Sequence, residues 1–300
     1  MKNYVVIAPM ILWSISLYSQ EFKLSNSKFK DYWYSGKAEI ASYELDISRY
    51  GENRTGNAVL IFVTEDFSRS KHVKLDRPQQ VPEDKVNVMK LNFTKKFLTG
   101  IYPYSMMTSV FTPALSDPEM PLKITSSSQE WCGNTFMQMN LEDDQYLFRG
   151  FSYFEKEGDV KYKIDQAMPE DNIWNLIRID PNLLPAGKIK LIPGTIPARL
   201  NHFKVEPENA VATLNVEEEE AVYTIDYPVL GRRLKITFES EFPFKITSWE
   251  ETFKVVKEGK EKTFVTKARL LNTVHTDYWT KTGNEDIEWR EKLKLPVIHQ

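Results

Sequence analysis

The chain has 300 residues, of which 41% are hydrophobic and 27% are charged, and its formal net charge is -3 at pH 7. This composition is typical of a folded globular protein, and the lack of a strong positive charge argues against nucleic acid as a partner. The aromatic content of 13% favours β-sheet. A single cysteine, Cys132, excludes an internal disulfide, so stability must come from the hydrophobic core.

Residues 1–20 have the pattern of a secretory signal peptide. Lys2 precedes an apolar run from Val5 to Leu17, and the small polar exit Tyr18-Ser19-Gln20 follows. The run is too short to span a bilayer, which favours export over a membrane anchor. We therefore expect a soluble, exported protein, periplasmic or extracellular, without an integral membrane segment in its mature form. The oligomeric state stays open.

Residues 21–165 predict a series of short strands. The stretch Lys37–Tyr50 alternates but changes phase near Ala41 and Ser42, which predicts a β-bulge. The run Ala58–Val63 is apolar at every position and predicts a strand that is buried on both faces. Further strands are predicted over Val86–Phe93, Ile101–Phe111, Leu122–Ser127, Glu130–Leu141 and Gln145–Glu155.

Residues 166–200 predict a helix followed by a connection rich in proline and glycine. Pro169 lies near the helix start, Ile173, Trp174 and Ile177 form one apolar face, and Pro181 ends the helix. Five prolines and glycines between residues 185 and 197 then predict a linker or a lid.

Residues 201–300 alternate with a clearer period of two. They predict a β half that includes a hairpin at Lys257-Glu258-Gly259-Lys260. We therefore expect a mostly β fold, either a large antiparallel open barrel or two packed β lobes, with one short helix. The lobes would be 21–165 and 201–300, or both could belong to one continuous domain.

The segment Ser126–Gly133 is the most unusual chemically, because it combines hydroxyls, the carboxylate of Glu130 and the only thiol. A nucleophilic Cys132 would need a neighbouring base. A buried, inert cysteine on a strand that alternates with Trp131 is the more common arrangement. The only histidines that could supply the base are His72, His202, His275 and His299.

Glu130 could instead act as the acid of a glycosidase. That reaction needs a second carboxylate about 5–9.5 Å away. An ordinary carboxylate on the surface of a strand is the more common reading, because the chain has 42 acidic residues. The partners considered are Glu155, Glu239, Glu250 and Glu251.

Aromatic and methionine side chains are the candidates for ligand binding. They could line an apolar cavity, or they could equally fill the interior of a barrel. These residues are Tyr102, Tyr104, Met106, Met107, Trp131, Phe151 and Phe154.

We expect no metal and no cofactor. The four histidines lack His-x-His and His-Glu-x-x-His spacing, and no D-x-D-x-D-G loop occurs. The G-x-S-x-G elbow, the P-loop and the dinucleotide fingerprint are also missing from the sequence.

Several segments resemble a family of exported bacterial proteins of unestablished function, whose members often carry the label "septum formation inhibitor Maf". Proteins of the Maf family proper have a Ser-x-Ser-Pro-Arg-Arg segment, which this sequence lacks. The resemblance therefore implies an exported β-rich protein and assigns no catalytic residue. The segments that carry it are Tyr34–Glu39, Val59–Asp66, Lys90–Phe93, Ile101–Met107 and Ser127–Gly133.

The last third of the chain, with Phe242–Ile246 and Thr263–Leu271, is more loosely similar to periplasmic envelope proteins built as open barrels, including lipoprotein carriers. That similarity implies a concave lipophilic surface. The leading hypothesis is therefore binding of an apolar or amphipathic envelope molecule, such as a lipid, without chemistry. The alternatives are a hydrolase of cell wall or glycan that uses Cys132 or Glu130, and an interaction protein that uses a sheet edge.

Overall fold

The structure is a computed structural model that describes residues 22, 25–114, 120–257 and 260–297. The predicted signal peptide, His299 and the turn residues 258–259 lie outside the described residues.

Sixteen strands of the described chain form one sheet, whose order is β10-β11-β12-β13-β14-β15-β16-β1-β2-β4-β5-β6-β7-β8-β9, with β3 paired to β2. Neighbouring strands are antiparallel, except that β10 and β11 are parallel. The first nine strands are β1 (Ala38–Arg49), β2 (Glu52–Ser68), β3 (Val73–Lys74), β4 (Lys85–Thr99), β5 (Tyr102–Pro113), β6 (Lys123–Glu130), β7 (Gly133–Glu142), β8 (Gln145–Ser152) and β9 (Val160–Asp165). The others are β10 (Met168–Pro169), β11 (Gly187–Ile192), β12 (Glu208–Val216), β13 (Glu220–Tyr227), β14 (Arg232–Glu239), β15 (Ile246–Lys257) and β16 (Lys260–Thr276).

The predicted mostly β fold is confirmed, as a single large sheet that is not closed. Its edges are β9 and β10, which follow one another in the chain. Short helices accompany the sheet within the described residues. They are α1 (Asn26–Trp33), α2 (Ile173–Ile179), α3 (Thr195–Asn201) and α4 (Glu288–Lys292), with 3-10 turns η1 (Pro78–Gln80), η2 (Glu170–Asn172), η3 (Pro181–Leu183), η4 (Tyr278–Thr280) and η5 (Asn284–Ile287).

Two local predictions are confirmed by the pairing of the strands. The register between β1 and β16 shifts between Ser42 and Tyr43, at the predicted bulge. The extra residue is Leu271 of β16, because Ser42 pairs with Asn272 and Tyr43 pairs with Leu270. β1 itself keeps a continuous register with β2: its residues Ala41, Tyr43 and Leu45 join the main core, whereas Ile40 belongs to the cluster on the outer face. β15 and β16 pair as far as Lys257 and Lys260, which is the predicted hairpin.

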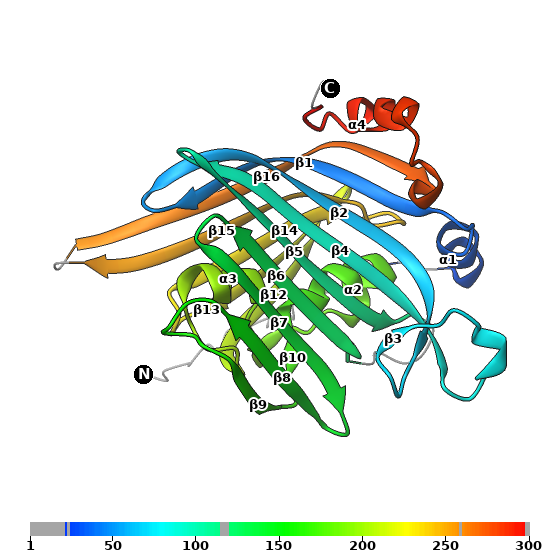
Figure 1. Ribbon diagram of the computed structural model, residues 1–300, viewed down its shortest axis with the longest axis horizontal. Helices are drawn as coiled ribbons and strands as arrows, with labels where there is room; N and C mark the ends of the chain where they lie inside the picture. The colour runs from blue at the N-terminus through cyan, green and yellow to red at the C-terminus, as the bar shows by residue number, and fades with distance from the viewer. Residues whose placement is uncertain (1–21, 23–24, 115–119, 258–259, 298–300) are drawn as a thin grey trace, which may run out of the picture.

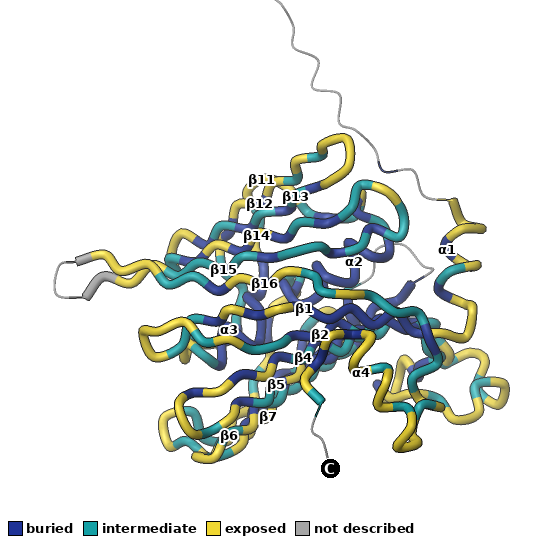
Figure 2. Tube along the Cα trace, turned by 90° about the horizontal axis from the view of Figure 1, so that it is seen from above, coloured by how far each residue is buried: buried dark blue, intermediate teal, exposed yellow. Residues whose placement is uncertain are grey.

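The sheet curves around α2 (Figures 1 and 2). Side chains of α2 and of the strands around it belong to the same hydrophobic core. Every residue of α2 is buried. The ring of Trp174 lies 5.0 Å from that of Phe93 on β4 and 5.3 Å from that of Trp249 on β15. Three other strands separate β4 from β15 in the sheet order, so one side chain can contact both only because the sheet is strongly curved.

A buried ion pair connects α2 to β1. Nη2 of Arg178 lies 2.5 Å from Oε2 of Glu39, and both side chains are fully buried. Tyr32 donates its hydroxyl proton to the same carboxylate oxygen, at 2.5 Å. The guanidinium lies over the rings of Trp33 and Phe62, at 5.2 and 5.0 Å. Burial alone would raise the pKa of Glu39, but the charge and hydrogen bonds of Arg178 and Tyr32 hold it below its ordinary value.

The C-terminal segment covers part of the outer face of the sheet. Leu293 and Leu295 pack on Ile40 and Val59. The opposite face of β2 contributes Leu60 and other residues to the main core. The strand predicted over Ala58–Val63 is therefore covered on both faces, as its continuous apolar run indicates.

Among the described residues, no helix is long and apolar enough to cross a membrane. The strands before and after segment 166–200 belong to the same sheet. The division into an N-terminal and a C-terminal lobe stays a prediction.

Candidate functional site

One end of the sheet, at the left in Figure 1, gathers several of its turns. The turns at Tyr50–Gly51, Gly100–Ile101 and Trp131–Cys132 lie there, because alternate hairpins of an antiparallel sheet turn at the same end. α3 lies inside the hollow near this end and packs against β5 and β6. The side chain of Thr195 on α3 is 3.2 Å from that of Thr108 on β5, and both are buried. Side chains of α3 are thereby held among the turns.

Arg199 of α3 is the centre of a polar network at this end. Its Nε donates to Oγ1 of Thr135 at 3.2 Å, and its Nη1 donates to Oε1 of Glu157 at 3.0 Å. Its Nη2 lies 3.5 Å from Oε1 of Glu130, and its guanidinium lies 4.7 Å from the ring centroid of Phe154. Two of the sequence candidates, Glu130 and Phe154, therefore meet at Arg199.

Glu157 connects the network to solvent. Its carboxylate accepts from the hydroxyl of Ser152 at 2.7 Å and lies 2.8 Å from Nδ1 of His202, which is exposed. Burial alone would raise the pKa of Glu157. The hydrogen bonds of Ser152 and His202 and the charge of Arg199 lower it below its ordinary value, so this carboxylate is ionised at neutral pH.

Tyrosines join the same end of the sheet. The hydroxyls of Tyr50 and Tyr104 are 2.8 Å apart, and Arg49 donates to Tyr104 at 3.3 Å and to the carbonyl of Leu200 at 2.6 Å. Tyr104 is 1% exposed, and burial raises its pKa above the ordinary value. These contacts attach α3 to β1 and β5, so the polar residues at this end have a structural role as well.

A cleft of about 410 Å³ lies along α3, and we name it the α3 cleft. Phe148, Tyr162 and Phe203 contribute to its apolar walls, and the first two rings stack at 4.6 Å. Arg199 and His202 contribute polar groups from the end of α3. Its volume lies in the range of small-molecule sites, roughly 300–1,000 Å³, and its lining combines apolar surface with a few polar groups.

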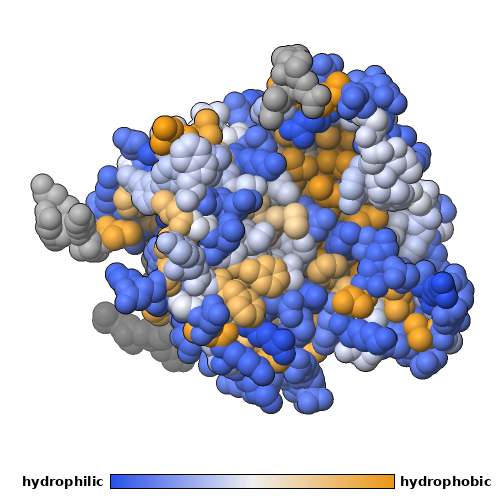
Figure 3. Space-filling view, viewed as in Figure 1, coloured by the Kyte–Doolittle hydropathy of each residue, from blue (hydrophilic) through white to orange (hydrophobic). Residues whose placement is uncertain are grey.

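The outer face of the sheet carries an apolar stripe beside this cleft. Met107, Phe136 and Phe151 are 38–50% exposed, and the last two are cross-strand partners with ring centroids 6.5 Å apart. Figure 3 shows an orange patch over β6 to β8, where these strands face the viewer. Phe136 and Phe151 also line the α3 cleft, so the stripe is continuous with it.

The remaining sequence candidates are dispersed. Tyr104 and Met106 lie in the main core, each 1% exposed. Trp131 and Cys132 lie at the exposed turn between β6 and β7, where the indole is 67% exposed and lies 6.4 Å from the ring of Tyr102. The candidates therefore do not line one common cavity.

Phe151 was a sequence candidate, but Arg199, Glu157 and the other lysine and phenylalanine residues along the α3 cleft were not. Arg199 follows Pro193, Gly194 and Pro197, which indicate a connection and give no signal of a charged centre. In the part of the chain that the structure describes, no group of three or more His, Cys, Asp or Glu side chains is arranged to hold a metal ion.

Comparisons with known proteins give little further information. No protein-family model matches the chain, and no curated protein matches it either. These comparisons give no support to the Maf label. One solved structure, "Crystal structure of MucB in complex with MucA(peri)", is 9% identical, with 82% of this chain and 94% of that chain covered and a TM-score of 0.13. A similarity at this level carries no argument about function.

Proposed function

We propose that the protein binds an amphipathic molecule of the cell envelope in the α3 cleft and does not transform it. The observation that carries this proposal is the composition of the cleft. Its walls are aromatic and aliphatic, whereas its rim is formed by charged and polar side chains from α3 and the loop after β8. The export implied by residues 1–20 would bring the protein to such molecules.

The apolar part of the ligand would lie on the aromatic walls. Phe136, Phe151 and Val160 leave apolar surface open to solvent, between 38% and 50% of each residue. Covering this surface is favourable by roughly 25 cal/mol per Å². The outer stripe extends the same surface beyond the cleft, so a chain longer than the cleft could continue along it.

The polar part of the ligand would lie at the rim. Lys156, His202 and Lys204 are exposed there, and Glu157 supplies an acceptor. The guanidinium of Arg199 already bonds Glu157 and Thr135, so it holds the rim in shape and has little capacity left for a ligand. Exposed lysines beside a carboxylate suit a polar head group that offers hydrogen-bond acceptors.

The hydrolase and sheet-edge alternatives stay predictions. Glu130 has its carboxylate turned to Arg199 and lines none of the clefts described here, and Cys132 lies on an exposed turn. β9 is an edge strand of the sheet and carries Lys161 and Lys163 among its exposed residues. Lysine on an edge strand discourages pairing with another chain.

Replacing Phe151 with serine will weaken binding of a fluorescent acyl probe. We expect a lipid-extracted protein to bind dansylated undecanoic acid at one site, measured by the rise in dansyl emission. Loss of the aromatic contact costs about 1–2 kcal/mol, so Kd will rise about fivefold to thirtyfold in the Phe151→Ser variant. Because Phe151 is 50% exposed, the fold will be retained.

Trp279→Ser is the matched control, because Trp279 is 49% exposed and lies on η4, outside the α3 cleft. Its Kd for the probe will equal that of the unmodified protein. Phe203→Ser, from the opposite wall, will weaken binding as Phe151→Ser does. Absence of saturable binding, or an equal loss in the Trp279 variant, would contradict the proposal.

A further inference from the structure

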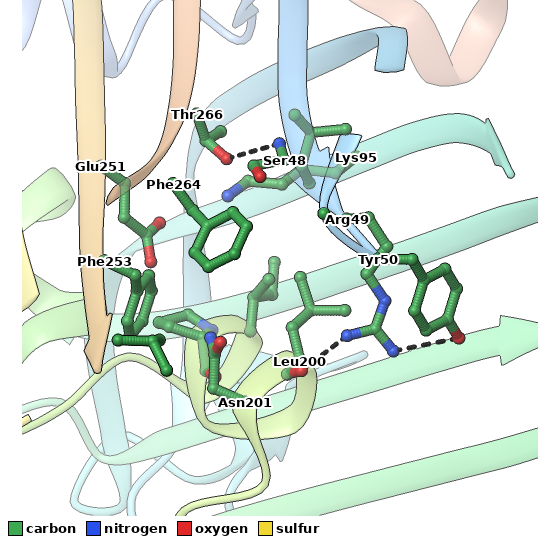
Figure 4. A pocket seen from close by; sticks show the side chains of 15 residues that line it. Ser48, Arg49, Tyr50, Lys95, Leu200, Asn201, Glu251, Phe253, Phe264 and Thr266 are labelled. Atoms are coloured by element: carbon green, nitrogen blue, oxygen red, sulfur yellow. Dashed lines mark hydrogen bonds between the residues drawn. The ribbon is translucent and has the colours of Figure 1, made fainter. Parts of the chain in front are cut away.

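A second cavity lies on the other side of α3, and we name it the Lys95 pocket (Figure 4). Its volume is about 150 Å³. Ile196, Pro197 and Leu200 of α3 line it, whereas Ala198 and Arg199 of the same helix line the α3 cleft. The helix therefore separates two cavities, and the occupant of one need not enter the other.

Lys95 places an amine inside this pocket. It is on β4, where Phe93, Lys95 and Phe97 alternate toward the interior, and it is 4% exposed. Its ammonium forms no hydrogen bond and no ion pair with the described residues, and it lies 4.9 Å from the ring centroid of Phe93. Figure 4 shows the amine end between Thr266 and Glu251, beside Phe264. The nitrogen is not sealed off by protein atoms and opens into the pocket, so a small molecule that enters the pocket can reach it.

The surrounding charges disfavour an anion as that molecule. Arg232 donates from Nε to Glu251 at 2.9 Å and from Nη2 to Glu170 at 2.7 Å, so two carboxylates share one guanidinium. Lys95 supplies the second positive charge opposite these two carboxylates and Asp171. This buried cluster already contains at least as many acidic side chains as basic ones. An anionic ligand would add a further negative charge to it.

A neutral electrophile avoids this conflict. Burial lowers the pKa of Lys95 below its ordinary value, although the charge of Glu251 opposes the shift, so more of the amine is unprotonated than in a surface lysine. An unprotonated amine is the nucleophile that reacts with carbonyl compounds. The pocket walls formed by Leu200, Phe253 and Phe264 suit an apolar carbon skeleton.

We propose that the Lys95 pocket is a reactive-amine site that takes a small apolar aldehyde or ketone and holds it as an imine. The amine nitrogen forms a bond to the carbonyl carbon, and the carbonyl oxygen takes up a proton to give the carbinolamine. The C–O bond of the carbinolamine then breaks, and the hydroxyl group leaves as water together with the proton given up by nitrogen. The C=N bond of the imine remains. No electrons are gained or lost overall. The carboxylate of Glu251, which faces the same pocket, can accept and return the transferred proton.

Reductive trapping tests this proposal. The full protein is incubated at pH 7 with benzaldehyde and cyanoborohydride, and modified lysines are located by peptide mass spectrometry. Benzaldehyde is suitable because a cavity near 150 Å³ accommodates a benzene ring. We expect Lys95 to be modified at least about fivefold faster than Lys96, the exposed neighbour on the same strand, and to reach one adduct per chain.

Two variants separate the pocket from general reactivity. Lys95→Met will lose the fast adduct, whereas Leu200→Trp will keep the lysine, fill the pocket and slow its modification by at least about fivefold. The rates of modification of Lys95 and Lys96 are compared within the unmodified protein. A folding defect in a variant therefore cannot affect that comparison. Modification of exposed lysines with Lys95 unmodified would overturn the proposal, as would unchanged labelling in the Leu200 variant. Neither result bears on the α3 cleft.

Discussion

Replacing Arg178 with leucine will lower the free energy of unfolding by about 3–5 kcal/mol, because the substitution leaves the carboxylate of Glu39 buried without its counter-charge. Both side chains are fully buried, and no other basic group in the described part of the chain forms an ion pair with Glu39. The guanidinium also fills the space between Trp33 and Phe62, so its removal weakens packing around α1 and β2. Urea denaturation at pH 7, followed by tryptophan fluorescence, measures the change.

An exposed pair of the same chemistry supplies the control. Nη2 of Arg269 lies 3.0 Å from Oε2 of Glu44, and these side chains are 76% and 54% exposed. Arg269→Leu will change the free energy of unfolding by less than about 1 kcal/mol. The double variant Arg178→Leu with Glu39→Leu will recover part of the loss, since it leaves no buried charge behind. Equal effects at Arg178 and Arg269 would show that burial does not decide the cost.

The sequence indicates the sheet well, because strand alternation is a local property. The phase change near Ser42 and the fully apolar run Ala58–Val63 both correspond to observed features. The helix predicted after Pro169 is also present, as α2. The sequence does not show that Glu170 and Asp171, on the turn η2 before α2, are buried. Their partners are distant in the chain: Arg232 bonds Glu170, and the backbone amide of Thr195 bonds Asp171.

α3 was not predicted, because its residues also suit an irregular connection. The helix begins after Gly194 and contains Pro197 within its first turn, where proline costs little. Without α3, the sequence cannot show whether the sheet encloses an open cavity or a packed interior. The predicted roles of Tyr104 and Met106 depended on that distinction, and both side chains pack in the core.

The candidate site was indicated only in part. Glu130 and Phe154 are among the sequence candidates, and both contact Arg199. Their proximity arises because the turn after β6 and the loop after β8 lie at the same end of the sheet as α3. A pattern of period two gives the face of each strand, but it does not give the side chains that α3 brings from the interior.

Asp171 shows how the buried charges beside α3 affect stability. Its Oδ2 accepts a hydrogen bond from the backbone amide of Thr195 at 2.9 Å. Burial, with the nearby charge of Glu170, raises its pKa from 3.8 to about 6, although the bond from Thr195 and the charge of Arg232 act in the opposite direction. The folded protein therefore holds this proton more tightly than the unfolded chain does.

Stability contributed by a raised acidic pKa is present below the unfolded value and is lost as the pH rises through the folded value. For Asp171 this loss falls between about pH 4 and pH 6 and amounts to about 3 kcal/mol. Asp171→Asn keeps an oxygen acceptor for Thr195 and cannot ionise. We expect the variant to match the unmodified protein near pH 4 and to exceed its free energy of unfolding by about 1–3 kcal/mol at pH 8.

The difference between the two proteins, measured by urea denaturation from pH 4 to pH 8, isolates this group, because the titration of other carboxylates cancels. Asp171→Leu distinguishes charge from hydrogen bonding, since it removes the charge and also leaves the buried amide of Thr195 without its acceptor. That variant will gain less at pH 8 than Asp171→Asn and will be less stable than the unmodified protein near pH 4. If the Asn variant differs from the unmodified protein by a constant amount at every pH, the pKa of Asp171 is the same in the folded and the unfolded chain, and burial does not raise it.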